Sequence, residues 1–279
     1  MLCMKKVGFI LAFLAIVVSS HAQTNANPIL VIRGSESGLR IMTKLREAYV
    51  TKYKDKMIDL AGYGSTMGIV YLKDGQTDVA VTSRRMTDEE LAEFQKDNTE
   101  ITEVNFAKEA FTVIVNKANP ITKLTKKQVG NIFAGYITNW KDVGGPDAPI
   151  KVYIRSNTSG CYLGFKELFL ENMNYTSRAL MLGTNSQLKN EIYKDKNAIS
   201  YLGFAGIDKN VKMLKISVDE INYYSPTAEN IANLTYPIYR TYHFYFKKKD
   251  AEKVKHFVDF VKSSDGKNVI LKNDYLPAD

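Results

Sequence analysis

The stretch ILVIRGSESGLRIMTKLREAY, residues 29–49, contains one complete strand, turn and helix unit. Residues 29–32 are all apolar, which predicts a strand. The turn Gly34-Ser35-Glu36-Ser37-Gly38 follows it. Beyond the turn, apolar side chains recur at the spacing of one helix face: Leu39, Met42, Leu45 and Tyr49. A strand that enters a helix through a short turn is typical of α/β proteins.

The same alternation continues through the middle of the chain. Strands are predicted at 78–82, 111–115 and 150–154 from their apolar and β-branched residues. Helices are predicted at 88–96 and 125–133, and the two threonines in front of or at the start of them fit an N-cap: Thr87 and Thr125. The pattern predicts an α/β protein with largely parallel sheets.

Two further helices are predicted from apolar faces. One face comprises Tyr162, Phe165, Leu168 and Phe169. The other, near the end of the chain, comprises Val254, Phe257, Val258 and Val261. Gly266 follows the second face and is interpreted as its stop signal.

Residues 1–22 have the composition of a secretory signal peptide. Lys5 and Lys6 precede an apolar run at 9–18, and Ala22 ends a segment of small residues where cleavage is expected. Cys3 lies before the apolar run, so we expect no lipoprotein anchor. The mature protein is therefore expected in the periplasm.

The composition narrows the classes of function. Removal of 22 of the 279 residues leaves 257, and removal of Lys5 and Lys6 reduces the net charge from +8 to +6. No dense basic block indicates nucleic-acid binding, and the excess lysines are interpreted as a solvated surface. Only Cys161 remains after cleavage, so no internal disulfide is expected. No group of histidines and cysteines has the spacing of a metal site, and no cofactor is predicted.

Three short turns share glycine and hydroxyl side chains ahead of a predicted helix. They are Gly34-Ser35-Glu36-Ser37, Gly64-Ser65-Thr66 and Thr158-Ser159-Gly160, and Arg155 lies four residues before Ser159. A helix N-terminus offers free N–H donors and a positive dipole, and glycine allows the close approach of an anion. Each turn by itself also fits an ordinary N-cap. Together they indicate an oxyanion site.

Longer motifs make the mature chain resemble the PstS-like family of phosphate-binding periplasmic proteins. The motifs are DVAVTSR at 78–84, LTKKQVGNIFAGYITNWKDVGG at 124–145, RSNTSGC at 155–161, AISYLGF at 198–204, YPIYR at 236–240 and DGKNVILKNDYLP at 265–277. The resemblance implies a two-lobed type II periplasmic binding protein fold, with the ligand cleft between the lobes. It implies a first lobe of residues 23–112 and 237–279 and a second lobe of 113–236, with the tyrosine-rich segment 236–246 as one crossing.

The resemblance also implies a function and a ligand set. The protein would bind inorganic phosphate as a monomer and deliver it to the permease of an ABC importer, without enzymatic activity. The ligand-binding residues carried over from the family's motifs are Ser35, Ser65, Ser83, Arg155, Ser159, Gly160 and Cys161. A guanidinium such as that of Arg155 suits a pair of phosphate oxygens.

Two positions depart from the family pattern. Cys161 stands where the family commonly has threonine, so a weak thiol donor replaces a hydroxyl. Ser83 stands where some members place an aspartate that accepts a proton from the ligand and so distinguishes phosphate from sulfate. Glu36 is a candidate for the missing acceptor. Alternatively, its carboxylate only complements the dipole of the helix that follows.

The sequence also fits two alternatives to phosphate import. Gly34, Ser37 and Gly38 match the G-x-S-x-G motif of serine hydrolases, with His243 or His256 as the base. About a dozen mature residues precede the motif, which leaves no room for the upstream strands of that fold. A phosphate scavenger or sensor, or a carrier of sulfate or arsenate, would use the same fold.

Overall fold

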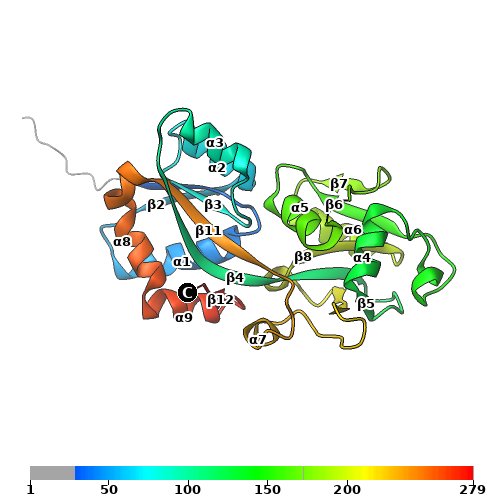
Figure 1. Ribbon diagram of the computed structural model, residues 1–279. Helices are drawn as coiled ribbons and strands as arrows, with labels where there is room; N and C mark the ends of the chain where they lie inside the picture. The colour runs from blue at the N-terminus through cyan, green and yellow to red at the C-terminus, as the bar shows by residue number, and fades with distance from the viewer. Residues whose placement is uncertain (1–28, 172, 279) are drawn as a thin grey trace, which may run out of the picture.

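The structure is a computed structural model, and it describes residues 29–171 and 173–278. The signal peptide expected at 1–22 lies outside the described residues. The chain forms two lobes that lie side by side, and two long strands pass between them (Figure 1). The mixed sheets and helices of the two lobes confirm the predicted α/β class and two-lobed architecture.

The first lobe contains both ends of the described chain. Its strands are β1 (Leu30–Gly34), β2 (Ile58–Gly62), β3 (Val79–Thr82), β12 (Leu276–Pro277) and parts of β4 (Ile101–Asn116) and β11 (Tyr239–Lys247). Its helices are α1 (Leu39–Lys52), α2 (Ser65–Lys73), α3 (Asp88–Gln95), the short turn η4 (Lys248–Asp250), α8 (Ala251–Lys262) and α9 (Ser264–Leu271). Helices α1, α8 and α9 pack around a core that includes Leu45, Phe244 and Phe257, whereas α2 and α3 pack around a smaller core that includes Leu72 and Phe94.

The second lobe is built from the middle of the chain. Its strands are β5 (Lys123–Thr125), β6 (Lys151–Arg155), β7 (Leu180–Leu182), β8 (Ala198–Gly203), β9 (Val211–Met213) and β10 (Lys215–Ser217). Its helical segments are α4 (Lys126–Ala134), η1 (Trp140–Val143), α5 (Gly160–Phe165), η2 (Lys166–Leu170), α6 (Asn185–Lys194), η3 (Phe204–Gly206) and α7 (Ala228–Ala232). Phe133, Trp140, Phe165 and Tyr201 belong to its buried core. Burying each such ring contributes about 1.5–3 kcal/mol.

The sheets are mixed, which corrects the expectation of largely parallel pairing. The main strand order is β2-β1-β3-β11-β4-β8-β6-β7. The outer pairs are parallel, because helices connect those strands. In the middle, β11 pairs antiparallel with β3 and β4, and β4 pairs antiparallel with β8. The reason is that β4 leaves the first lobe and β11 returns to it, so the two crossings run in opposite directions.

The crossing strands fix where the lobes meet. Residues 101–110 of β4 pair with β11, whereas Phe111 and the residues after it pair with β8. Ile238 accepts a backbone hydrogen bond from Phe111 at 3.0 Å immediately before β11. The segment 236–246 is thus extended for most of its length. The lobe boundaries at 112/113 and 236/237 stay predictions.

The predicted helix starts are correct at two threonines, and one predicted helix end is wrong. Thr87 and Thr125 each form a capping box at the start of α3 and α4. Gly266, however, lies inside α9 rather than after the preceding helix, which ends at Lys262. A side chain at position 266 would overlap the carbonyls of Phe260 and Val261. This glycine therefore permits close packing of α9 against the end of α8.

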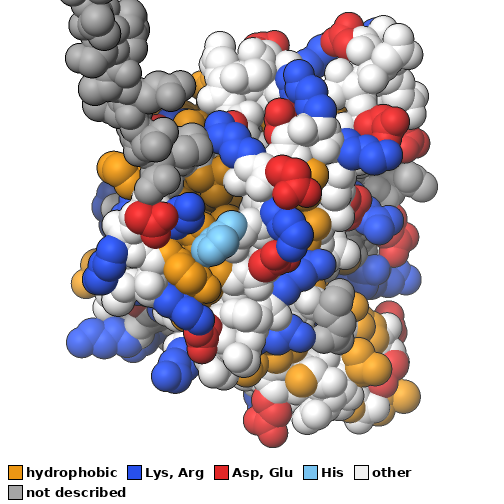
Figure 2. Space-filling model, turned by 90° about the vertical axis from the view of Figure 1, so that its left-hand side faces the viewer, with side chains coloured by type: hydrophobic (Ala, Val, Ile, Leu, Met, Phe, Trp, Pro, Cys, Tyr) orange, Lys and Arg blue, Asp and Glu red, His pale blue; other side chains and the backbone are white. Residues whose placement is uncertain are grey.

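The surface supports the interpretation of the excess positive charge as solvated. Figure 2, which views the first lobe, shows basic and acidic side chains interspersed over this face. Several of them form exposed ion pairs, such as Lys44 with Glu47 and Lys52 with Asp265. Such pairs contribute little to stability. Within residues 29–171 and 173–278, no helix has the length and apolar character needed to cross a membrane.

Candidate anion-binding site

Three serines of the first lobe lie at the ends of neighbouring strands. Ser35 follows β1, Ser65 begins α2 after β2, and Ser83 follows β3. Because these three strands are parallel, their carboxyl ends meet at one edge of the sheet, where α/β proteins commonly bind ligands. The Ser65 hydroxyl accepts a hydrogen bond from the Ser83 amide at 3.1 Å, and the two hydroxyl oxygens lie 3.4 Å apart. All three serines are buried.

The second lobe supplies an arginine and a helix start. Arg155 is the last residue of β6, and Ser159 is the N-cap of α5. The Ser159 hydroxyl accepts a hydrogen bond from the Cys161 amide at 3.2 Å. The Gly160 amide is at the first helical position, where amides have no partner within the helix. Each lobe therefore has hydrogen-bond donors where a turn leads into a helix, with Ser65 at the start of α2 in one lobe and Ser159 before α5 in the other.

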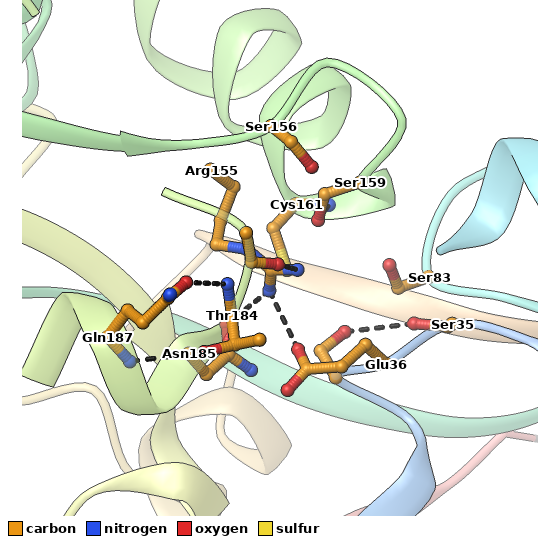
Figure 3. Close-up of polar contacts among 12 residues, drawn as sticks. Ser35, Glu36, Ser83, Arg155, Ser156, Ser159, Cys161, Thr184, Asn185 and Gln187 are labelled. Atoms are coloured by element: carbon orange, nitrogen blue, oxygen red, sulfur yellow. Dashed lines mark hydrogen bonds and ion pairs between the residues drawn. The ribbon is translucent and has the colours of Figure 1, made fainter. Parts of the chain in front are cut away.

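The turns of the two lobes are in contact. The Thr66 amide donates to the Thr158 carbonyl at 3.4 Å. A Cβ at Gly160 would overlap the hydroxyl oxygens of both Ser65 and Ser83. Glycine is thus required at position 160 by this approach. Figure 3 shows Ser35 and Ser83 on one side of the same space as Arg155 and Ser159.

Arg155 is the most constrained group of this site. Its side chain is 2% exposed. One terminal nitrogen, Nη1, donates to Asn185 Oδ1 at 2.5 Å and to Glu36 Oε2 at 2.8 Å, and Nη2 donates to the Gly183 carbonyl at 2.7 Å (Figure 3). The third nitrogen, Nε, is buried and has no hydrogen-bond partner. A buried unpaired donor costs about 1–3 kcal/mol, which an anion at this position would recover.

Glu36 belongs to the first lobe and joins Arg155 across the interface. Its side chain is 26% exposed, so one end of this ion pair remains accessible to water. Glu36 and Asn185 also line a cavity of about 240 Å³ that extends to Arg40 and Tyr275. The carboxylate is therefore placed where it can face both Arg155 and solvent. The role of Glu36 as a proton acceptor stays a hypothesis.

Two of the three residues that hold Arg155, Gly183 and Asn185, were not predicted from the sequence. Gly183 and Asn185 flank Thr184, which is the N-cap of α6 and forms a capping box with Gln187 (Figure 3). The sequence Gly183-Thr184-Asn185 has the same glycine and polar character as the three turns that were recognised. That signal could have revealed a fourth helix start near the site.

Cys161 points to a second buried arginine. Arg240 Nη1 lies 2.7 Å from Cys161 Sγ, and the cysteine is 1% exposed. Arg240 also donates to Glu109 Oε2 from Nε at 3.0 Å and from Nη2 at 2.6 Å. Burial would lower the pKa of Arg240, but Cys161, Tyr242 and Glu109 raise that pKa well above its usual value. Burial raises the pKa of Tyr242 as well.

The structure does not bring the residues of the hydrolase alternative together. Ser37 Oγ lies 2.9 Å from Ser35 Oγ. His243 is bonded to Glu103, and His256 is bonded to Tyr49, each at 2.8 Å. Neither of the two histidines in the described part of the chain hydrogen-bonds to Ser37, so neither is placed as the expected base. The described residues also contain no cluster of three or more potential metal ligands.

Comparisons with known proteins agree with this architecture. A family model described as a PBP superfamily domain matches residues 19–265. The phosphate-binding protein PstS of Borreliella burgdorferi is 28% identical over 282 residues, which cover 98% of this chain and 99% of that protein.

Two solved structures are similar over nearly the whole fold. An ABC-type phosphate transport receptor from Vibrio cholerae is 34% identical with a TM-score of 0.72, and the match covers 88% of this chain and 99% of that one. A structure from Clostridium perfringens, described as a phosphate ABC transporter substrate-binding protein with bound phosphate, is 29% identical with a TM-score of 0.81. That match covers 90% of this chain and 100% of the other. The chain therefore belongs to the PBP superfamily and, within it, to the family of PstS-like proteins.

Proposed function

We propose that this protein binds inorganic phosphate between its two lobes and delivers it to an ABC importer. The observation that carries the proposal is the Nε of Arg155, a fully buried donor without a partner. Gly160, which follows Arg155 by five residues, lies against the hydroxyls of Ser65 and Ser83 from the other lobe. The names of the relatives support phosphate as the anion.

The proposed ligand set is the one expected from the sequence. Arg155 supplies the charge, and Ser35, Ser65, Ser83 and Ser159 supply neutral hydroxyls, together with the amide of Gly160. Hydrogen bonds to a charged group each contribute about 1.5–3 kcal/mol, and several of them can offset the dehydration of the anion. Cys161 belongs to the proposed set through its position at the start of α5. Its thiol instead contacts Arg240.

The setting of the protein is part of the proposal. It would be secreted through its signal peptide, remain unanchored in the periplasm, act as a monomer and release phosphate to a membrane permease. No cofactor, metal or nucleic acid would take part, and no catalysis would occur. The proteins to which it is similar are named as binding or transport proteins, which supports this role.

Isothermal titration calorimetry of the mature protein tests the proposal. Phosphate, arsenate and sulfate would each be titrated at pH 5, 6, 7 and 8. We expect one phosphate per chain with a dissociation constant of about 1 μM or tighter, which corresponds to about 8 kcal/mol of binding free energy. Absence of phosphate binding at millimolar concentration would refute the proposal. Tighter binding of sulfate than of phosphate would instead favour the alternative oxyanion carrier.

A further inference from the structure

Glu109 and Arg240 form a buried pair at the point where the chain crosses between the lobes. They are direct partners in the register of β4 and β11, the two crossing strands. Their side chains are 2% and 3% exposed. Arg240 is also enclosed by rings, with its guanidinium carbon 4.8 Å from the centre of Phe111 and 5.0 Å from that of Tyr242. This pair is thus fixed to the crossing strands rather than to the outer part of either lobe.

From this pair, contacts reach the anion-binding turn of the second lobe. Arg240 Nη1 contacts Cys161 Sγ at 2.7 Å, and Cys161 follows Gly160 at the start of α5. The Cys161 amide in turn donates to the Ser159 hydroxyl. Glu109 Oε1 accepts a hydrogen bond from the Ala205 amide at 3.1 Å, which is a second link to this lobe.

Other contacts from the same pair reach the anion-binding turn of the first lobe. Tyr242 donates to Glu109 Oε2 at 2.6 Å, and its hydroxyl lies 3.5 Å from Ser37 Oγ. Ser37 Oγ lies 2.9 Å from the hydroxyl of Ser35. A continuous series of polar contacts therefore joins Ser35 to Ser159 through the crossing strands.

We infer that Tyr242, Glu109 and Arg240 are positioning residues that couple lobe closure to anion binding. This inference rests on the proposed function and adds residues that do not touch the anion. The series attaches to a turn in each lobe, so separating the lobes breaks at least one of its contacts. Breaking such a contact leaves part of a buried ionic group unpaired, which is costly. The series is complete only when the lobes meet, so it favours the arrangement in which both turns face the anion.

The test compares two tyrosines that each lose one buried hydroxyl. Tyr242→Phe removes the donor to Glu109, whereas Tyr236→Phe removes a 2.6 Å hydrogen bond to the Phe111 carbonyl outside the series. Phosphate affinity is measured by calorimetry, and the thermal midpoint is measured without phosphate. We expect Tyr242→Phe to weaken phosphate binding about tenfold, chiefly through faster dissociation. We expect Tyr236→Phe to leave affinity within about twofold of the parent while lowering the midpoint.

A double-mutant cycle separates coupling from general damage to the fold. Tyr242→Phe is combined with Cys161→Ala, two sites that the contacts of Glu109 and Arg240 join. If the residues act as one series, the combined loss of affinity is smaller than the product of the two single losses. Multiplicative losses, or equal losses for Tyr242→Phe and Tyr236→Phe, would overturn the inference while leaving phosphate binding by the parent intact. If the parent bound no phosphate, the proposed function and this inference would both fail.

Discussion

Arg155 and Arg240 are both buried guanidinium groups at the junction of the lobes, but their surroundings differ. Arg240 uses all three nitrogens on Glu109 and Cys161, and its carboxylate partner is 2% exposed. Arg155 keeps Nε unpaired, and its carboxylate partner Glu36 is 26% exposed. A buried pair whose groups are all hydrogen-bonded stabilises the fold, whereas an unpaired donor beside a more accessible partner is available to a ligand. This difference supports the proposals that Arg155 binds the anion and that Arg240 is a positioning residue.

Removal of Arg155 should have the largest effect on binding. Arg155→Ala eliminates the charge and at least one charge-assisted hydrogen bond to the anion. We expect phosphate affinity to fall about 1,000-fold, or about 4 kcal/mol. Calorimetry measures the loss, and urea unfolding of the phosphate-free protein serves as the control. A loss below about tenfold would show that Arg155 is not the main ligand.

Removal of Arg240 should instead act mainly on stability. Arg240→Met leaves the Glu109 carboxylate buried without its ion-pair partner, and we expect the free energy of unfolding to fall by about 3 kcal/mol. Urea unfolding without phosphate measures this change. The double variant with Glu109→Leu should recover much of the loss, because it removes the stranded charge. An unchanged free energy of unfolding in Arg240→Met would contradict the claim that Arg240 stabilises the fold whereas Arg155 serves binding.

Gly160→Ala tests the close approach of the lobes. The added methyl would overlap the Ser65 and Ser83 hydroxyls, so the two turns would have to move apart before the lobes could close. We expect a cost similar to that of overpacking a core. We expect phosphate affinity to fall about 30-fold, or about 2 kcal/mol. Gly206→Ala is the matched control, since a Cβ there meets nothing within 4 Å. Equal affinities for the two variants would contradict the closed arrangement of the site.

Glu36→Gln should produce the smallest effect, on selectivity rather than on phosphate affinity. The Glu36 carboxylate beside Arg155 can accept a hydrogen bond from a protonated phosphate oxygen. Sulfate has no proton at pH 7, so the same carboxylate would repel it. We expect the preference for phosphate over sulfate at pH 7 to fall about tenfold, or about 1.4 kcal/mol. Competition calorimetry measures it, with the exposed Glu47→Gln as control. Unchanged discrimination would leave Glu36 only its ion pair and the helix dipole.

Local patterns in the sequence predicted many of the helices and strands. Threonine caps and apolar spacing predicted helix starts because those interactions act within four residues. The wrong end at Gly266 arose because this glycine lies in a second helix that packs against the end of the preceding one, at Phe260 and Val261. The antiparallel centre of the sheet arose from pairing between distant strands, which has no signal in a window of a dozen residues.

The site was recognised only in part for the same reason. The serine turns and Arg155 lie in short motifs, so sequence reasoning could find them. Glu109 and Arg240 are 131 residues apart along the chain and become neighbours through the register of β4 and β11. Glu109 follows Lys108 in β4 and Arg240 lies among tyrosines in β11, so nothing local in the sequence links the two, and their pairing is visible only in the fold.

The most direct measurement is a crystal structure of the protein with phosphate. The account predicts a phosphate oxygen within hydrogen-bonding distance of Arg155 Nε, with serines of both lobes around the same anion and the Glu109–Arg240 pair unchanged. A phosphate bound at Arg240, or at a surface away from Arg155, would contradict it.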